Sequence, residues 1–105
     1  MVMSKKYVLQ HIRKEYRRCY KRPVHGMPKI VFDQITMHNW AVEEILRQLG
    51  KLDESAFRYT NMPCDIVEMF IKKMDEYACA SKEKSHWFSA ARDAGEWVLD
   101  ILISL

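Results

Sequence analysis

The chain has little glycine, proline or cysteine, and each shortage excludes a class of protein. Three glycines and three prolines among 105 residues are too few for turn-rich sandwiches and barrels or for glycine-rich phosphate-binding folds. The three cysteines, Cys19, Cys64 and Cys79, form no C-x-x-C pair, so neither a disulfide framework nor a zinc ribbon is expected. An odd number of scattered cysteines favours a reducing compartment, and we predict a cytoplasmic protein.

Long apolar runs are also missing. The run from Tyr7 to Leu9 is interrupted by Gln10 and is too short for the core of a signal peptide. The last eight residues, Val98 to Leu105, contain Asp100 and fall far short of the roughly 20 apolar residues that span a bilayer. We therefore expect neither secretion nor membrane binding.

The remaining composition is that of a folded helical domain. Hydrophobic residues make up 49% of the chain and charged residues 30%, which excludes a disordered protein. The length is that of one ordinary domain, so we predict a single helical domain over residues 1–105.

Apolar residues recur at helical spacing in four segments. These predicted helices cover residues 4–22, 29–49, 62–81 and 85–105. Ser4, Asn61 and Ser85 are the expected N-caps of three of them, and Gly50 is placed to end the second as a C′ residue. The pattern predicts an all-α fold, a small antiparallel four-helix bundle. The alternative is a three-helix core from which the first helix is splayed or exchanged into a dimer.

Two connections have their own signals. Residues 23–28 hold two prolines and a glycine and form a turn between the first and second helices. Asp53 is placed to cap a single helical turn that runs through Phe57 and Tyr59. The second signal predicts a short connecting helix before residue 62.

Charge is divided unevenly along the chain. Residues 1–29 hold nine lysines and arginines and one acid, for a net charge of +8, whereas residues 30–105 hold eight against thirteen acids, for −5. Such a division concerns partners or self-association rather than fold.

The basic third supplies the main candidate binding site. Six cations share the polar face of the first predicted helix: Arg13, Lys14, Arg17, Arg18, Lys21 and Arg22. They predict contact with an acidic macromolecule, either a nucleic-acid backbone, whose binding would weaken with salt, or an acidic protein surface. An inhibitor or adaptor of a nucleic-acid-handling machine fits both. Tyr16 and Tyr20 fall on the apolar face, away from the cations. The competing interpretation is a solvated face that offsets the acidic remainder.

A second candidate interface lies on the second helix. Phe32, Trp40 and Arg47 fall on the face opposite the apolar stripe, and aromatic residues with arginine are typical of interface hot spots. If the helix has two neighbours, Trp40 is instead part of a second core face. A homodimer is the structural alternative, with the basic helix meeting the acidic stripe of Asp93, Glu96 and Asp100.

Signals for catalysis are weak. Glu83-x-x-His86 matches half of a di-metal motif whose second half is missing, and His38 lies on an apolar stripe, where a core histidine is the usual case. Cys64 is near a helix N-terminus, a position that can lower the pKa of a thiol, but we expect a structural thiol there. We expect a non-enzymatic protein without metal or cofactor. A metal-dependent enzyme using Glu83, His86 and His38 is the further alternative.

Overall fold

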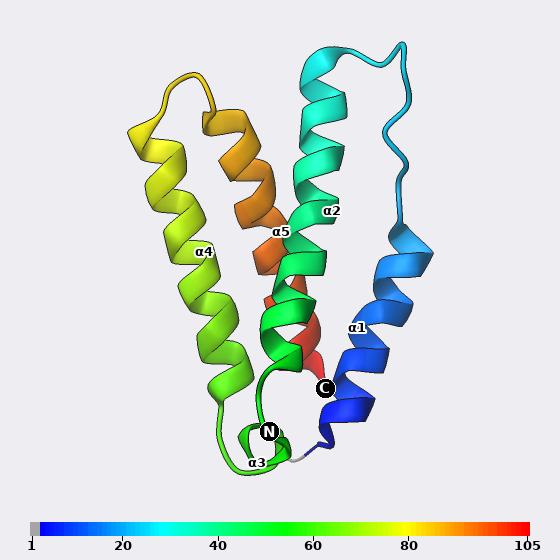
Figure 1. Cartoon of the computed structure of the whole chain (residues 1–105), viewed down its shortest axis with the longest axis vertical. Helices are drawn as coiled ribbons and strands as arrows, with labels where there is room; N and C mark the ends of the chain where they lie inside the picture. The colour runs from blue at the N-terminus through cyan, green and yellow to red at the C-terminus, as the bar shows by residue number, and fades with distance from the viewer. Residues whose placement is uncertain (1–2) are drawn as a thin grey trace.

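The computed structural model describes residues 3–105, and within that range the fold is all-α. The helices follow in the order α1 (Lys5–Cys19), α2 (Lys29–Gly50), α3 (Glu54–Arg58), α4 (Met62–Ala80) and α5 (Ser85–Ser104). The four long helices run alternately up and down, and the C-terminus lies at the same end as α3 (Figure 1). The all-α prediction is confirmed, as is the short connecting helix, because Asp53 is the N-cap residue of α3.

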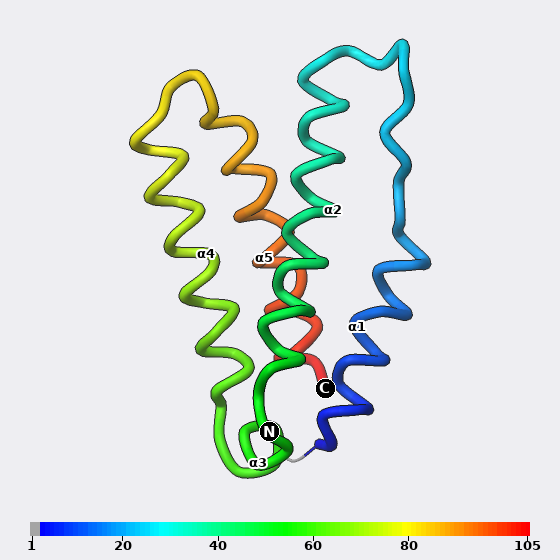
Figure 2. The backbone as a smooth tube through the Cα atoms, in the orientation of Figure 1, coloured from blue at the N-terminus to red at the C-terminus, as the bar shows by residue number. Residues whose placement is uncertain are grey.

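The first helix ends earlier than predicted. α1 stops at Cys19, and Tyr20 is extended, with φ −61° and ψ 130°. Two causes act here: Pro23 disfavours a helical conformation at Arg22, and Asn39 Nδ2 donates a hydrogen bond of 3.0 Å to the Lys21 carbonyl. Residues 20–24, called the strap below, therefore run as an extended trace towards the turn before α2 (Figure 2). The prediction that Lys21 and Arg22 belong to the helix was wrong.

Two of the predicted helix ends also differ in detail. Gly50 is the last residue of α2 rather than a C′ residue. Lys51, in a right-handed helical conformation, is the cap and donates its N–H to the Gln48 carbonyl, and the Leu52 N–H donates to the Leu49 carbonyl. Ser85 is the first residue of α5 rather than its N-cap, which is Lys84. The cap at Ser4 is confirmed, because its hydroxyl accepts a hydrogen bond from the Tyr7 N–H at 3.1 Å.

The core runs along α5, which packs against both α4 and α2. Small residues let α4 approach closely: a Cβ added at Gly95 would lie 2.8 Å from Ile71 Cγ1 and 3.2 Å from Phe70 Cδ1. Ala91 and Ala94 are fully buried beside it. The alanine and glycine stretch of α5 therefore allows the close approach of α4.

α1 is fixed to this core mainly by its first half, which holds its buried residues Val8, Leu9 and Ile12. In the second half, the partly buried Tyr16 also packs against the core. The first turn of α1 is held by Lys5, whose backbone N–H donates to the Glu54 carboxylate at 3.2 Å and whose Nζ donates to the carbonyls of Gly50 and Leu52, at 2.6 and 2.8 Å.

As a result, α1 lies beside the C-terminal half of α2 (Figure 1). The predicted apolar stripe of α2 is therefore only half covered. Val42, Ile45 and Leu49 are fully buried, whereas Val31 is 37% exposed.

Candidate anion-binding groove and the neighbouring cleft

The six cations of the predicted binding site are all exposed, and most of them have no ion-pair partner among the described residues. Arg18 pairs with Glu15 at 2.8 Å. The other five form no ion pair within residues 3–105. Direct pairing inside the molecule therefore does not offset the charge of this segment, and its cations are available to a partner.

Three arginines from two helices line one groove, called the basic groove below. Its volume is about 500 Å³, and its lining comes from α1 and α2: Arg13, Tyr16, Arg17, Glu43, Leu46, Arg47 and Gly50. Arg13 and Arg17 are one helical turn apart, so their guanidinium groups extend from the same side of α1. Leu46 is buried and supplies an apolar floor, and Glu43 adds one carboxylate.

Arg47 is held in place before any ligand arrives. It contacts the Glu44 carboxylate through both Nη2 and Nε, the latter at 2.9 Å. The hydrogen bond from Arg47, helped by one from Gln48, lowers the pKa of Glu44 to about 2. The fixed pair orients the arginine, and the planar guanidinium has further donors for an anion.

Tyr16 forms a wall of the basic groove and contacts Tyr20 of the strap. Its ring meets that of Tyr20 edge to face, with centroids 5.6 Å apart and planes at 86°. Burial, followed by the nearby Glu43, raises the pKa of Tyr16 to about 12. The phenol therefore stays neutral at physiological pH.

Tyr20 does not lie where the sequence pattern placed it. Because α1 ends at Cys19, Tyr20 leaves the apolar face and stands in the strap with 51% of its surface exposed. Its neighbours in the chain are the cations Arg18, Lys21 and Arg22. An exposed aromatic ring thus belongs to the same segment of the chain as these cations.

The predicted interface of Phe32, Trp40 and Arg47 is not brought together. The Phe32 ring stacks on His25, with centroids 6.3 Å apart. The Trp40 ring lies against that of Phe70 of α4, with centroids 6.1 Å apart, and 42% of the Trp40 surface is exposed. Arg47 belongs to the basic groove instead. The sequence left two alternatives for Trp40, a place in a second core face or a place on an open face. The structure shows an intermediate case, in which the ring packs against α4 and is still partly exposed.

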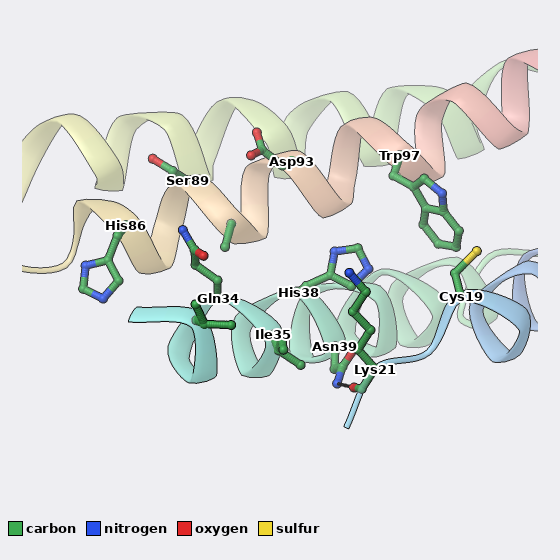
Figure 3. Close-up of a pocket in the computed structure, with 12 residues that line it drawn as sticks. Cys19, Lys21, Gln34, Ile35, His38, Asn39, His86, Ser89, Asp93 and Trp97 are labelled. Carbon is green, nitrogen blue, oxygen red and sulfur yellow. Dashed lines mark hydrogen bonds between the residues drawn. The ribbon is translucent and has the colours of Figure 1, made fainter. Parts of the chain in front are cut away.

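A larger cleft of about 740 Å³ lies between α2 and α5, beside the strap (Figure 3). It opens where α1 does not cover α2. Its walls are partly apolar and partly polar: Cys19, Lys21, Val31, Gln34, Ile35, His38, Asn39, His86, Ser89, Ala90, Asp93 and Trp97. The hydrogen bond from Asn39 to the Lys21 carbonyl ties the strap to its edge (Figure 3).

His38 lines this cleft, and its ring faces Trp97 with centroids 5.9 Å apart. Partial burial lowers the pKa of His38, the Lys21 charge lowers it further, and Asp93 acts in the opposite direction. The imidazole is therefore neutral near pH 7. The histidine predicted from the apolar stripe is a half-buried residue of an open cleft, not a member of the core.

Asp33 joins α2 to the start of α5. The Trp87 indole N–H donates to Asp33 Oδ2 at 2.8 Å, and His86 Nε2 lies 3.3 Å from the same oxygen. These bonds, led by that from Trp87, lower the pKa of Asp33. No sequence motif marks this contact, because the partners are 53 and 54 residues apart.

The proposed metal residues have other surroundings. His86 is engaged with Asp33, while His38 faces Trp97. Over residues 3–105, no three His, Cys, Asp or Glu side chains are grouped so that they could hold a metal ion.

Cys64 has the properties of the structural thiol expected for it. Burial of its thiol, followed by the charges of Glu68 and Asp65, raises the pKa of Cys64. The thiol is therefore protonated near pH 7.

None of the helices in the described part of the chain is long and apolar enough to cross a membrane. Comparisons with protein-family models, with curated proteins and with solved structures found no match to this chain.

Proposed function

We propose that this protein is a non-enzymatic helical module that binds the phosphate backbone of a nucleic acid through the basic groove and the strap. In this proposal the fold is an antiparallel four-helix bundle whose first helix covers only half of the length of α2. The observation that carries the proposal is the convergence of Arg13, Arg17 and Arg47, from two helices, on one groove. Arginine is suited to phosphate because its planar fork of donors matches two oxygens.

The length of the basic segment supports a polyanion rather than a single anion. Residues 13–19 rise about 1.5 Å each in the helix, and residues 19–22 about 3.3 Å each where the chain enters the extended strap. The cations therefore spread over roughly 20 Å, which corresponds to about six charges along one nucleic-acid strand. Six cations lie over that length, and Arg18 among them pairs with Glu15.

A phosphate backbone is favoured over an acidic protein surface by the scarcity of apolar anchors. The centres of protein interfaces are depleted of charged residues and enriched in aromatic ones. Here the exposed segment from Arg13 to Arg22 consists mostly of charge, with Tyr20 as its one half-exposed aromatic residue. A module of this kind would act as an adaptor or an inhibitor by occupying phosphates that another protein needs.

Fluorescence anisotropy with labelled single-stranded and duplex nucleic acid, titrated with salt, tests the proposal. If about six phosphates are neutralised, log K falls against log salt with a slope between about −4 and −5. In the variant Arg13→Gln/Arg17→Gln, two phosphate contacts are lost, so the slope becomes shallower by about 1.5.

The matched control is Lys72→Gln/Lys82→Gln, which removes two exposed cations from the acidic remainder of the chain. It should leave the slope unchanged. An equal loss in both variants would contradict a dedicated groove. If the protein fails to bind either nucleic acid at about 50 mM salt, the proposal is wrong, and a pull-down with the Arg13/Arg17 variant as reference would then look for an acidic protein.

The homodimer stays a prediction. Sizing the protein at low and high salt checks it, because a dimer held by the basic helix and the acidic stripe should dissociate as ionic strength rises.

A further inference from the structure

We propose that Tyr20 is a stacking platform for one base of a single-stranded nucleic acid, so that the module binds single strands more tightly than duplex. This inference rests on the proposed function and specifies its ligand. An aromatic ring among cations is the general device by which proteins bind single strands without reading their sequence.

The position of the ring supports this role. Tyr20 is half exposed, and its extended backbone projects it from the strap rather than along the helix. Arg18 precedes it by two residues and Lys21 follows it directly. The phosphates that flank a stacked base therefore meet a segment rich in cations, in which Arg18 also pairs with Glu15 and Lys21 also lines the neighbouring cleft.

The basic groove and the ring are contiguous. Tyr16 lines the basic groove, and its ring contacts that of Tyr20, with centroids 5.6 Å apart. A phosphate held by Arg13 and Arg17 is thus one side chain away from the ring. A single strand can place its backbone in the groove and turn a base onto Tyr20.

The ring is also held in a defined orientation. Tyr16 supports one side of it edge to face, and the next residue, Lys21, is fixed through its carbonyl by Asn39. Tyr59, by contrast, is 80% exposed and lies just after α3, at the other end of the molecule from the strap (Figure 1). It is therefore the matched control residue.

Duplex binding should not use the ring. Bases in a duplex are already stacked on one another, and extruding one costs a few kcal/mol. A duplex can contact Arg13 and Arg17 but gains nothing from Tyr20. The two strand forms therefore separate the phosphate contacts from the stacking contact.

The test compares Tyr20→Ala, Tyr20→Phe and Tyr59→Ala on oligothymidine of about 20 nucleotides and on a duplex of the same length. Loss of one stacked base lowers the affinity of Tyr20→Ala for the single strand by about 5- to 150-fold. Its affinity for duplex should stay within about two-fold. Tyr20→Phe keeps the ring, so it should retain the affinity for both forms, as should Tyr59→Ala. Circular dichroism checks that each variant is folded.

The outcomes separate this inference from the proposed function. If Tyr20→Ala loses nothing, or loses as much for duplex as for single strand, the stacking role is overturned, while the Arg13→Gln/Arg17→Gln variant still tests phosphate binding. If Tyr20→Phe falls as far as Tyr20→Ala, the hydroxyl is responsible and stacking is again overturned. If the unaltered protein binds neither form, both proposals fail.

Discussion

The α4–α5 hairpin and α1 share an amphipathic pattern but use it for different purposes. In the hairpin, buried residues extend over more than half of each helix, from Pro63 to Met74 on α4 and from Ala91 to Leu102 on α5. In α1 they stop at Ile12, and the arginines begin at the next residue. A helix that is buried over most of its length contributes mainly to stability. One that packs over half its length can present the other half to a partner.

The comparison implies that stability and binding are located in different parts of the molecule. The first half of α1 should behave as core, whereas its second half and the strap should tolerate substitution without unfolding. The predictions below test this division, beginning with the largest expected effect.

Within α1, Ile12→Ala and Arg17→Ala should differ sharply. Ile12 is fully buried, and truncating a buried isoleucine to alanine lowers the free energy of unfolding by about 2–5 kcal/mol. Arg17 is exposed, so its truncation should stay within about 0.5 kcal/mol. Urea unfolding of both variants measures the difference. A loss below about 1 kcal/mol for Ile12→Ala would favour the three-helix core with a splayed α1.

In the hairpin, Gly95→Leu should destabilise by overpacking. The new side chain would meet Ile71 and Phe70, and such insertions typically lower the free energy of unfolding by about 1–3 kcal/mol. Gly50→Ala is the control, because a Cβ there meets nothing within 4 Å. That variant should gain about 0.4–1 kcal/mol through the reduced entropy of the unfolded chain. Equal midpoints for the two variants in thermal unfolding would show that α4 and α5 do not approach closely at Gly95.

The smallest effect concerns pH and the cleft. The pKa of His38 in the folded protein is below its ordinary value of 6.5, so the unfolded chain takes up this proton first. Stability from the neutral ring is complete above pH 6.5 and is lost as pH falls through the folded pKa. In His38→Gln this component is absent. Its melting temperature should therefore fall less than that of the unaltered protein between about pH 7.5 and pH 5.5. An equal fall would mean that burial in the cleft does not lower the pKa of His38.

The helices were predictable because their signals are local. The apolar spacing within each segment and a residue such as Asp53 act over a few positions, and the observed boundaries of α2, α4 and α5 lie within one residue of those predicted. The end of α1 was not predictable in the same way. Pro23 gave a local hint, but the hydrogen bond from Asn39 reaches across 18 residues.

The candidate site was predictable only in part, for the same reason. Arg13 and Arg17 share a helical face that any helical projection reveals. That Arg47 joins them depends on how α1 lies against α2, which is set by the packing of Val8, Leu9 and Ile12. The exposure of Tyr20 follows from the early end of α1. The apolar pattern extends the helix to residue 22, so it could not predict this exposure.

The two attachments of the N-terminal segment bear on how a ligand would be bound. Lys5 fixes one end to the carbonyls after α2, and Asn39 fixes the Lys21 carbonyl near the other. The backbone between them has already lost its conformational freedom on folding, a loss of about 1–2 kcal/mol for each residue. A ligand that meets this segment has only side chains left to order. Its association should therefore show little of the entropy loss and heat-capacity change that mark folding coupled to binding.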